Sequence, residues 1–599
     1  MNTAPNAFYT QRIAALEEQL NSIKKKLFAS SMTRLSVFVA VSFGVYFFFG
    51  NTQLVLATLL LGIVAFVFLV SRHNDLSYQK KLLQQLIFIN RKELKALQRE
   101  VSDFPEGNEF KEDSHYFSQD IDLFGKGSFF QYLNRTATQE GTKRLANLLK
   151  SNAISNIPQK QNTLKELSQK AEWRQLFTAH AQVSSSEIAT QRVVGFLKSH
   201  KPFILGVVRY LPMIYSAISI GVLSLYFLGI ITEMQLLLWF FIGVGTTGIY
   251  FKRVTNLSGK GAMVREVFYQ NQQLIALLES ENFEDETLRK FKRSIQTEGA
   301  KASQVIKEFS KFLDSLDQRN NLIFGVVANG FFLWDIFQSY RIEQWILQNA
   351  NQVAQWFSVL TEIDVQNSLA NFVFNHQQYC FPSIVKGKIR LEATGFVHPL
   401  LDPKKAVVND FKIENQQFFI ITGANMAGKS TFLRTVSLGI VMANLGLPVC
   451  ATSFKYNPIK LITSMRTSDS LTDDESYFFS ELKRLKFIVE QIQQDNYFII
   501  LDEILKGTNS TDKALGSRKF IEKLIASHHA SRQAGSTGII ATHDLSLCEV
   551  EKHHSEVKNF YFDAEIINDE LHFDYTLKNG IAQNMNASFL LRKMKIVDD

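Results

Sequence analysis

Residues 423–430 read GANMAGKS, which has the G-x-x-x-x-G-K-S spacing of a phosphate-binding loop. An apolar segment, QQFFIIT, precedes this loop, and a helical segment, TFLRTVSLGIVMANL, follows it. In that context backbone N–H groups can surround phosphates, while Lys429 reaches the β- and γ-phosphates and Ser430 ligates Mg²⁺. We therefore predict that this loop binds ATP with Mg²⁺. The predicted ATP-binding residues are Gly423, Ala424, Asn425, Met426, Ala427, Gly428, Lys429, Ser430 and Thr431.

Two later apolar segments end in residues that could complete such a site. YFIILDE places Asp502 and Glu503 at the end of a predicted strand, and TGIIATH ends in His543. Asp502 could hold Mg²⁺ together with Ser430, and Glu503 could polarise the attacking water as a general base. We also assign His543 to the catalytic group, as a hydrogen-bond partner of the γ-phosphate. Taken singly, an Asp-Glu pair can be a solvated turn and a histidine can be a core residue. Their order after the phosphate-binding loop favours hydrolysis of ATP.

The predicted elements change character along the chain. From about residue 388, short apolar runs alternate with helical ones, as in an α/β fold with a mainly parallel sheet. Upstream, apolar residues recur at helical spacing. We predict a P-loop α/β ATPase domain joined to an all-α helical core with two transmembrane helical hairpins.

Several of these segments resemble the MutS family of DNA mismatch-repair ATPases. The phosphate-binding loop ITGANMAGKSTFLRT, the stretch LDEILKGTNSTDK and the segment IIATHDLSL are each similar to a MutS motif. VHPLL with VVND resembles the entry to the same domain, although Ala406, Val407 and Val408 stand where the family has an aromatic residue that stacks on adenine. The resemblance implies ATP hydrolysis with Mg²⁺, a homodimer, and DNA as a ligand.

The resemblance also implies a contact between two copies of the chain. SDSLTDDESYFFSELKRL is similar to the family segment whose serine reaches the γ-phosphate bound by the partner, which is Ser476 here. Asp474 replaces a glycine of the family and Tyr477 replaces a threonine. We predict Ser476 as the trans-dimer residue, so that hydrolysis requires two protomers.

Two segments of the middle region resemble the MutS core domain. They are LFGKGSFFQYLNRTATQEGTKRLANLL, at residues 123–149, and VLTEIDVQNSLANFVFNHQQYCFP, at residues 359–382. These segments are expected to pack as helices that position the ATPase, without chemistry of their own. We identify no separate domain before the core that would wedge an aromatic residue beside a mispair, so DNA binding is expected from the resemblance and mispair recognition is not.

Four uncharged apolar runs form two predicted hairpins, Leu35–Gly50 with Leu54–Val70 and Tyr210–Ile231 with Met234–Phe251. A bilayer core needs about 20 helical residues, so the first pair is slightly short and could instead be re-entrant or interfacial. A buried helical hairpin in a soluble core is the other alternative, but these runs have no polar face. Lysine and arginine flank the runs and are absent from the two turns. The positive-inside rule then predicts a multi-pass protein of the cytoplasmic (inner) membrane, in contact with lipid, with its ATPase in the cytoplasm.

Composition restricts the choice of function only weakly. The chain of 599 residues has 65 Lys and Arg against 57 Asp and Glu, a net charge of +8 that fits either nucleic acid or an anionic membrane surface. Its three cysteines lie far apart without a C-x-x-C spacing, which excludes a disulfide framework and a cysteine zinc site.

These observations predict seven units. They are an N-terminal helix (1–34), hairpin 1 (35–71), a linker helix (72–116), the first part of the core (117–209), hairpin 2 (210–251), the second part of the core with its lever (252–387) and the ATPase domain (388–599). The leading hypothesis is a membrane-anchored, MutS-like ATPase that acts as a dimer. The alternative is an ABC-like ATPase that drives transport, membrane remodelling or a scaffold switch without DNA.

Overall fold

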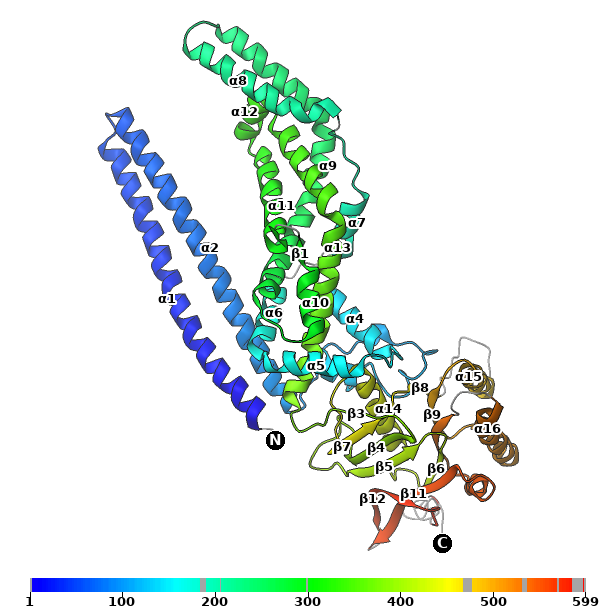
Figure 1. Cartoon of the computed structure of the whole chain (residues 1–599). Coiled ribbons are helices and arrows are strands. Elements are labelled where there is room, and N and C mark those ends of the chain that lie inside the picture. The colour runs from blue at the N-terminus through cyan, green and yellow to red at the C-terminus, as the bar shows by residue number, and fades with distance from the viewer. Residues whose placement is uncertain are drawn as a thin grey trace.

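The computed structural model describes residues 3–183, 190–204, 206–297, 300–466, 477–530, 536–567, 570–583 and 596. Two long helical arms rise from a compact region that contains the sheets, and both arms extend away from the sheets toward the same end of the molecule (Figure 1). The first arm is N-terminal, and the second is formed by the middle of the chain. The C-terminal third forms the compact region.

The first arm is a helical hairpin of α1 (Thr3–Phe47) and α2 (Thr52–Leu97). Asn51 begins α2, because its side-chain oxygen accepts hydrogen bonds from the backbone N–H groups of Gln53 and Leu54. The apolar side chains near the tip are exposed, and they include Phe47 and Phe49, each at 82%. No other described part of the protein covers this part of the hairpin.

The second arm ends in another hairpin, formed by α8 (Leu211–Phe227) and the start of α9 (Glu233–Ser280). Among the described residues, four helical segments are long and apolar enough to cross a membrane: Ala4–Phe47, Thr52–Leu97, Gly206–Phe227 and Glu233–Ser280. A further apolar helix, α12 (Leu322–Phe332), packs against α8 and α9 and was not predicted from the sequence. It meets α13 (Trp334–Asn375) at an angle of 84°.

The other helices build the stalk of the second arm and the core beneath it. In chain order they are η1 (Asn108–Phe110), α3 (Phe129–Leu133), α4 (Gln139–Lys150), α5 (Ile157–Gln169), α6 (Ala171–Val183), α7 (Thr190–Ser199), η2 (Gly206–Tyr210), α10 (Glu286–Ser294), α11 (Ala302–Asp317) and η3 (Gln318–Asn320). A two-stranded ribbon, β1 (Gln296–Thr297) with β2 (Ala300–Lys301), precedes α11. The apolar faces of these helices share one hydrophobic core with the C-terminal domain.

The two segments that resemble the MutS core lie against each other. Asp364 on α13 accepts hydrogen bonds from the backbone N–H groups of Ala137 and Thr138 and from the Thr138 hydroxyl, at 2.7 to 3.1 Å. Ser368, one turn later, accepts from the backbone N–H of Arg135 at 2.8 Å. Polar groups of α13 therefore fix the chain that leads into α4.

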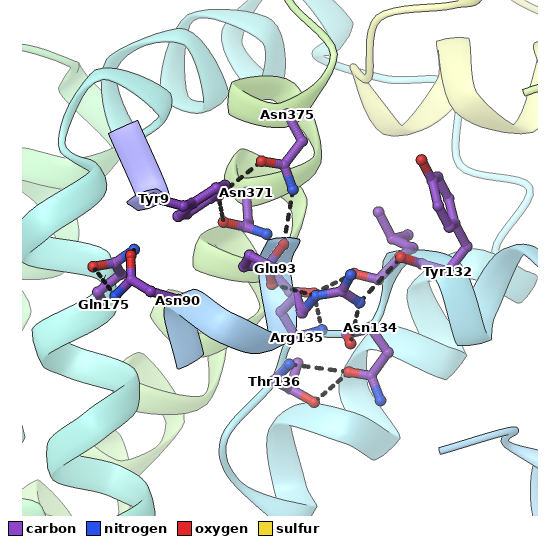
Figure 2. A network of polar contacts seen from close by, with 12 residues as sticks. Tyr9, Asn90, Glu93, Tyr132, Asn134, Arg135, Thr136, Gln175, Asn371 and Asn375 are labelled. Carbon is purple, nitrogen blue, oxygen red and sulfur yellow. Dashed lines mark hydrogen bonds and ion pairs between the residues drawn. The ribbon is translucent and has the colours of Figure 1, made fainter. Parts of the chain in front are cut away.

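A buried polar network holds the first arm on the core (Figure 2). The Glu93 carboxylate on α2 accepts from Arg135 Nε at 2.5 Å and from Asn375 Nδ2 at 2.8 Å. The Tyr9 hydroxyl of α1 donates to Asn375 Oδ1 at 2.7 Å. Glu93 is 3% exposed, and the positive charge of Arg135 keeps its pKa below the usual range despite burial, which opposes this shift. The network joins both helices of the arm to α13.

The C-terminal domain contains two sheets. Among the described residues, the larger has the order β12-β11-β6-β10-β9-β8, with β12 antiparallel and the other strands parallel. Its strands are β6 (Phe418–Gly423), β8 (Lys460–Ser464), β9 (Tyr497–Asp502), β10 (Thr537–Ala541), β11 (Val557–Ile567) and β12 (Glu570–Asn579). The smaller has the order β3-β7-β4-β5, with β3 (Ser383–Ile384), β4 (Ile389–Phe396), β5 (Asn409–Glu414) and β7 (Ser453–Tyr456). The helical segments of this domain are α14 (Lys429–Leu445), α15 (Tyr477–Ile492), α16 (Ser510–Ala530) and η4 (Leu545–Lys552).

The parallel strands explain how distant motifs can meet. β6, β9 and β10 are adjacent, parallel and almost fully buried, as expected for strands rich in isoleucine and phenylalanine. Their carboxyl ends therefore lie at one edge of the sheet, where sites of open α/β sheets form. The loop after Gly423, the Asp502–Glu503 pair and His543 all follow these ends directly.

Candidate functional site

The loop between β6 and α14 has the conformation that its glycines permit. Gly428 begins α14 with φ at 105°, a left-handed value at which a side chain would be strained. A Cβ added to Gly423 would approach the carbonyl oxygen of Phe562 to 2.5 Å. The Lys429 ammonium group folds back along the loop and donates to the carbonyl oxygens of Gly423 and Ala424 at 2.7 and 2.9 Å. Burial lowers the pKa of Lys429, since Asp502 and Glu503 offset the loss of solvent only in part.

The predicted magnesium ligands meet at the start of α14. The Ser430 hydroxyl donates to Asp502 Oδ2 at 2.6 Å, although the two residues lie 72 positions apart in the chain. Ser430 occupies the first turn of α14 and Asp502 ends β9, so the contact is set by the packing of that helix on the sheet. A hydroxyl and a carboxylate at this separation offer two oxygen ligands of the kind that Mg²⁺ takes.

The predicted base and the predicted histidine are paired. His543 Nε2 lies 2.8 Å from Glu503 Oε1 and 3.4 Å from Lys429 Nζ, while Lys506 Nζ lies 3.9 Å from Glu503 Oε2. The hydrogen bond from His543 lowers the pKa of Glu503 to about 2, against burial, which opposes the shift. Glu503 is thus held ionised and is a weak base as long as His543 faces it.

These groups line one cavity of about 720 Å³. Residues 424–431 of the loop form its floor, and Asp502, Glu503 and His543 lie along the sheet edge. The volume lies within the range of about 300 to 1,000 Å³ that is typical of sites for small molecules. Of the predicted loop residues, Gly423 does not line the cavity, although its carbonyl oxygen accepts from Lys429.

The far side of the cavity has residues that the sequence reasoning did not assign. Tyr575 on β12 lines it and reaches the phosphate-binding loop, since a Cβ on Gly428 would meet the Tyr575 ring at 3.2 Å. Asn409 holds this part of β12, because it donates to the carbonyl of Tyr575 at 3.1 Å and accepts from Leu577 N at 2.7 Å. His398 also lines the cavity, and burial lowers its pKa to about 4, so it is neutral near pH 7. Ala406 and Val407, which stand in place of the expected aromatic residue, face the same space as the Tyr575 ring.

Another residue that was not assigned from the sequence, Glu481, supports the Glu503–His543 pair from outside the cavity. Glu481 on α15 is 3% exposed, and its carboxylate accepts from the backbone N–H groups of Leu505 and Lys506 at 2.6 and 2.9 Å. The segment that it holds has two non-glycine residues in the left-handed region, Glu503 with φ at 50° and Leu505 with φ at 61°. Its place in SELKRL marked Glu481 as part of a motif, but no local pattern indicated which backbone it contacts.

Ser476, the predicted trans-dimer residue, lies outside the residues that the structure describes. Its position relative to the cavity is therefore left as the sequence predicted it. The described residues nearest to it begin α15, the helix that supplies Glu481.

Comparison with known proteins supports the same assignment for the C-terminal region. The family profile for MutS domain V matches residues 419–594, which contain all but the first residue of β6, the phosphate-binding loop, Asp502, Glu503 and His543. Residues 419–594 of the chain are therefore similar to this domain of the MutS family. The matched region begins at the first parallel strand of the site and includes the antiparallel strand that holds Tyr575.

Curated MutS-family proteins match a longer part of the chain at low identity. The DNA mismatch repair protein MutS of Desulfatibacillum aliphaticivorans is 28% identical over 51% of this chain and 31% of its own length. The human MutS protein homolog 4 is 30% identical over 32% of this chain and 20% of its own length. MutS of Aquifex pyrophilus is 27% identical over 42% of this chain and 28% of its own length. The chain thus covers at most about a third of the length of these relatives.

Proposed function

We propose that this protein is a membrane-anchored, MutS-like ATPase that binds and hydrolyses ATP with Mg²⁺. The observation that carries this proposal is the convergence of Lys429, Ser430, Asp502, Glu503 and His543 on one cavity at the carboxyl ends of three parallel strands. A phosphate-binding loop, an oxygen ligand pair and a carboxylate base are the parts that hydrolysis of a nucleoside triphosphate needs.

The residues of the loop bind the triphosphate. Backbone N–H groups at the start of α14 donate to phosphate oxygens, and the partial positive charge of the helix N-terminus adds to this attraction. Lys429 is preorganised for the β- and γ-phosphates, because its ammonium group is held at the loop by two carbonyl oxygens. The 2.6 Å contact between Ser430 and Asp502 fits a shared metal site, in which bound Mg²⁺ would neutralise charge on the β- and γ-phosphates.

Glu503 and His543 have different roles at the γ-phosphate: Glu503 acts as the base and His543 contacts the phosphate. Without nucleotide, His543 holds Glu503 as a weak base. A γ-phosphate offers His543 a second anionic partner, and a His543 that turns to it frees Glu503 to accept a proton from the attacking water. When His543 turns from Glu503 to the γ-phosphate, the change also reaches the segment after Glu503, which Glu481 supports.

Tyr575 is proposed to contact the base of the nucleotide. Its ring lies at the cavity beside Gly428, on the side opposite the Asp502–Glu503 edge, and it is 43% exposed. An exposed aromatic ring beside a phosphate-binding loop can stack on adenine. This role would compensate for the missing aromatic residue at positions 406–408.

The apolar helices anchor the ATPase at the cytoplasmic face of the cell membrane. Both hairpins point away from the ATPase domain and expose large apolar side chains that no described part of the protein covers (Figure 1). Exposure of such surfaces to water costs about 25 cal/mol of free energy for each Å² of apolar area, whereas contact with the interior of a bilayer does not. The basic residues that flank the apolar runs, and the turns that lack them, support a cytoplasmic location for the ATPase domain.

Dimer formation and DNA binding are proposed from the family. Two of the relatives carry the printed name DNA mismatch repair protein MutS. A homodimer would bring Ser476 of one protomer to the γ-phosphate of its partner, and closure of the two ATPase domains would move the helical core. DNA is the ligand that this resemblance suggests, and a specific response to a mispair is not expected.

The competing function is an ATPase that drives transport, membrane remodelling or a scaffold switch without DNA. One observation favours it: α2 and α9 each extend without interruption from an apolar tip into the core. Movement of the core would therefore be transmitted directly to helices that are long and apolar enough to cross a membrane.

The test is ATP turnover by the full chain in lipid nanodiscs, with no DNA, with a matched duplex and with a mispaired duplex. We expect Lys429→Ala to abolish nucleotide binding and Glu503→Gln to bind ATP without turnover. Wild-type turnover in Glu503→Gln would refute the assignment of the base. Stimulation by either duplex, weakened steeply by salt, supports the DNA-dependent function, whereas turnover that ignores both duplexes favours the membrane function.

A further inference from the structure

The short helix α12 has the composition of a membrane segment but only half the length. Residues 322–332 read LIFGVVANGFF, without an acidic or basic side chain. Eleven residues span about 16 Å as a helix, against about 30 Å for the hydrocarbon core of a bilayer. Leu322 and Ile323 are 78% and 79% exposed, so α12 does not bury its apolar surface inside the protein.

Contacts with hairpin 2 place the two ends of α12 at different levels along α9. Before α12 begins, the Arg319 guanidinium lies over the ring of Phe251, at the end of the apolar run of α9. Near its C-terminal end, Gly330 packs directly on Gly243 and Phe240, in the middle of that run. Eight helical residues separate Gly243 from Phe251, which is about 12 Å. The helix thus rises alongside the apolar part of α9 and stops half-way.

The end of α12 is built for surroundings without water. The last carbonyl groups of a helix have no partner within the helix, and hydrocarbon cannot supply one. A hydroxyl group of α8 does so here, since Ser216 donates to the carbonyl of Phe332 at 3.3 Å. The Tyr215 hydroxyl of α8 lies between the carbonyl oxygens of Trp239 and Gly330, at 2.6 and 3.1 Å. The chain then turns by 84° at Leu333, which has φ at 48°, and continues as α13.

Charged groups next to α12 are paired and enclosed by protein. Arg319 precedes the helix and Asp335 follows it, and their side chains form an ion pair at 3.2 Å with exposures of 10% and 2%. Ionisable groups at membrane depth pair in this way and face the protein interior. The pair also brings the entry and the exit of the segment together, as a re-entrant segment requires.

A groove of about 1160 Å³ lies between α12 and α8. Met213, Ala217 and Ile220 of α8 form one wall, and Ile323 and Val327 of α12 form the other. Trp334 lies at one end, with its ring nitrogen bonded to the carbonyl of Ser315 at 2.8 Å. The groove is apolar and continuous with the apolar surface of hairpin 2, and aromatic residues with a polar edge of this kind favour the boundary of a bilayer.

We infer that α12 is a re-entrant helix inside the bilayer and that lipid acyl chains fill the groove between α12 and α8. This inference rests on the membrane anchoring proposed above. It adds a membrane element with its end half-way across the bilayer, and a lipid-facing site on the same helix that leads into α13. The chemistry of the occupant is that of a hydrocarbon chain, because the walls consist mainly of aliphatic and aromatic side chains.

The test uses single nitroxide labels on the full chain in nanodiscs, after Cys380, Cys450 and Cys548 are replaced by alanine. Labels at Ile323 and Val327 report on α12 and the groove. Leu238 on α9 is the marker for hairpin 2, and Leu347 on α13 is the matched control, an aliphatic side chain 59% exposed outside the apolar region. Power saturation compares collisions with oxygen, which concentrates in lipid, and with a neutral nickel complex, which stays in water.

The expected result is a ratio of oxygen to nickel collisions several-fold higher at Ile323 and Val327 than at Leu347, and close to that at Leu238. A label at Val327 that meets nickel freely would mean a water-filled groove, and one that meets neither reagent would mean a groove covered by protein; either result overturns the inference. If Leu238 is also open to nickel, membrane anchoring itself has failed. Frequent collisions with oxygen at Leu238 together with frequent collisions with nickel at Ile323 would leave the membrane anchoring intact and would refute only the re-entrant position of α12.

Discussion

Replacing Glu481 by alanine should impair turnover while nucleotide binding is retained. The Glu481 carboxylate holds the backbone N–H groups of Leu505 and Lys506, directly after the base Glu503. Hydrogen bonds to a charged group contribute about 1.5–3 kcal/mol each. The segment that they hold has two non-glycine residues in the left-handed region, each strained by about 1–3 kcal/mol. The bonds and the strain are of similar size, so the strained segment relaxes once the carboxylate is removed.

Relaxation moves Glu503 and leaves the phosphate-binding loop in place. A displacement of about 1 Å of a catalytic group can reduce turnover about 100-fold. Lys429 and Ser430 belong to α14 and do not contact Glu481, so the dissociation constant for ATP should change by less than about threefold, an energy below about 0.7 kcal/mol. Glu481→Gln retains one acceptor oxygen and should give an intermediate kcat.

The assay pairs phosphate release under saturating ATP with binding of a fluorescent ATP analogue to the same preparation. Glu490→Ala is the matched control, because Glu490 lies on the same helix and forms an exposed ion pair with Lys486 at 3.7 Å. A kcat in Glu481→Ala equal to that of the control would refute the reasoning. So would a loss of ATP affinity as large as the loss of kcat, since Glu481 would then act on the whole domain.

Three further predictions concern the contact of Tyr575 with the nucleotide base, the buried carboxylate of Asp364 and the network that holds the first arm on the core. Tyr575→Ala should weaken ATP binding by about 1–2 kcal/mol, as measured by titration calorimetry. Tyr575→Phe should retain the wild-type affinity, because the aromatic ring makes the stacking contact. Equal losses of affinity in both variants would argue against stacking. Burial raises the pKa of Asp364 to about 6, so the stability that this group contributes should fall as the pH rises from about 4 to 6 and stay constant above. Thermal unfolding should therefore show that the stability of Asp364→Asn rises relative to that of the wild type between about pH 4 and 6. Parallel curves of stability against pH for the two proteins would contradict the raised pKa of Asp364. Glu93→Ala leaves Arg135 without its carboxylate in a buried site and should destabilise the fold by about 3–5 kcal/mol, whereas Glu17→Ala, which removes an exposed pair with Arg91, should change stability by less than about 1 kcal/mol.

The sequence predicted those parts of the site that are local in the chain. Lys429 and Ser430 follow a strand and begin a helix within eight residues of Gly423, and Asp502 and His543 end strands with recognisable apolar patterns. Once a parallel sheet was expected, its geometry required these strand ends to meet at one edge. The pairing of Glu503 with His543 follows from the adjacency of β9 and β10, an order that periodicity does not give.

The residues that were missed come from elements whose contacts depend on the whole fold. Tyr575 reaches the cavity because β12 folds back along β11 at the sheet edge, and nothing in its own surroundings marks that position. Glu481 lies on a helix face that meets the Glu503 segment only after α15 has packed on the domain. The helix α12 was not predicted because its 11 residues are about half of a membrane span, so a search for spans passes over it.

The arrangement of the arms connects the proposed ATPase to the proposed membrane surface through two different routes. The second arm is continuous with the core, because α13 begins beside α12 and ends at Asn375, inside the buried network of Figure 2. The first arm joins the core through side chains, with Glu93 of α2 and Tyr9 of α1 both bonded to that same asparagine. A shift of α13 would therefore be transmitted through Asn375 to both arms at once. Because interfaces of this kind repack between discrete arrangements instead of deforming smoothly, a change in the ATPase that moves α13 should alter the angle between the two arms before it alters either arm.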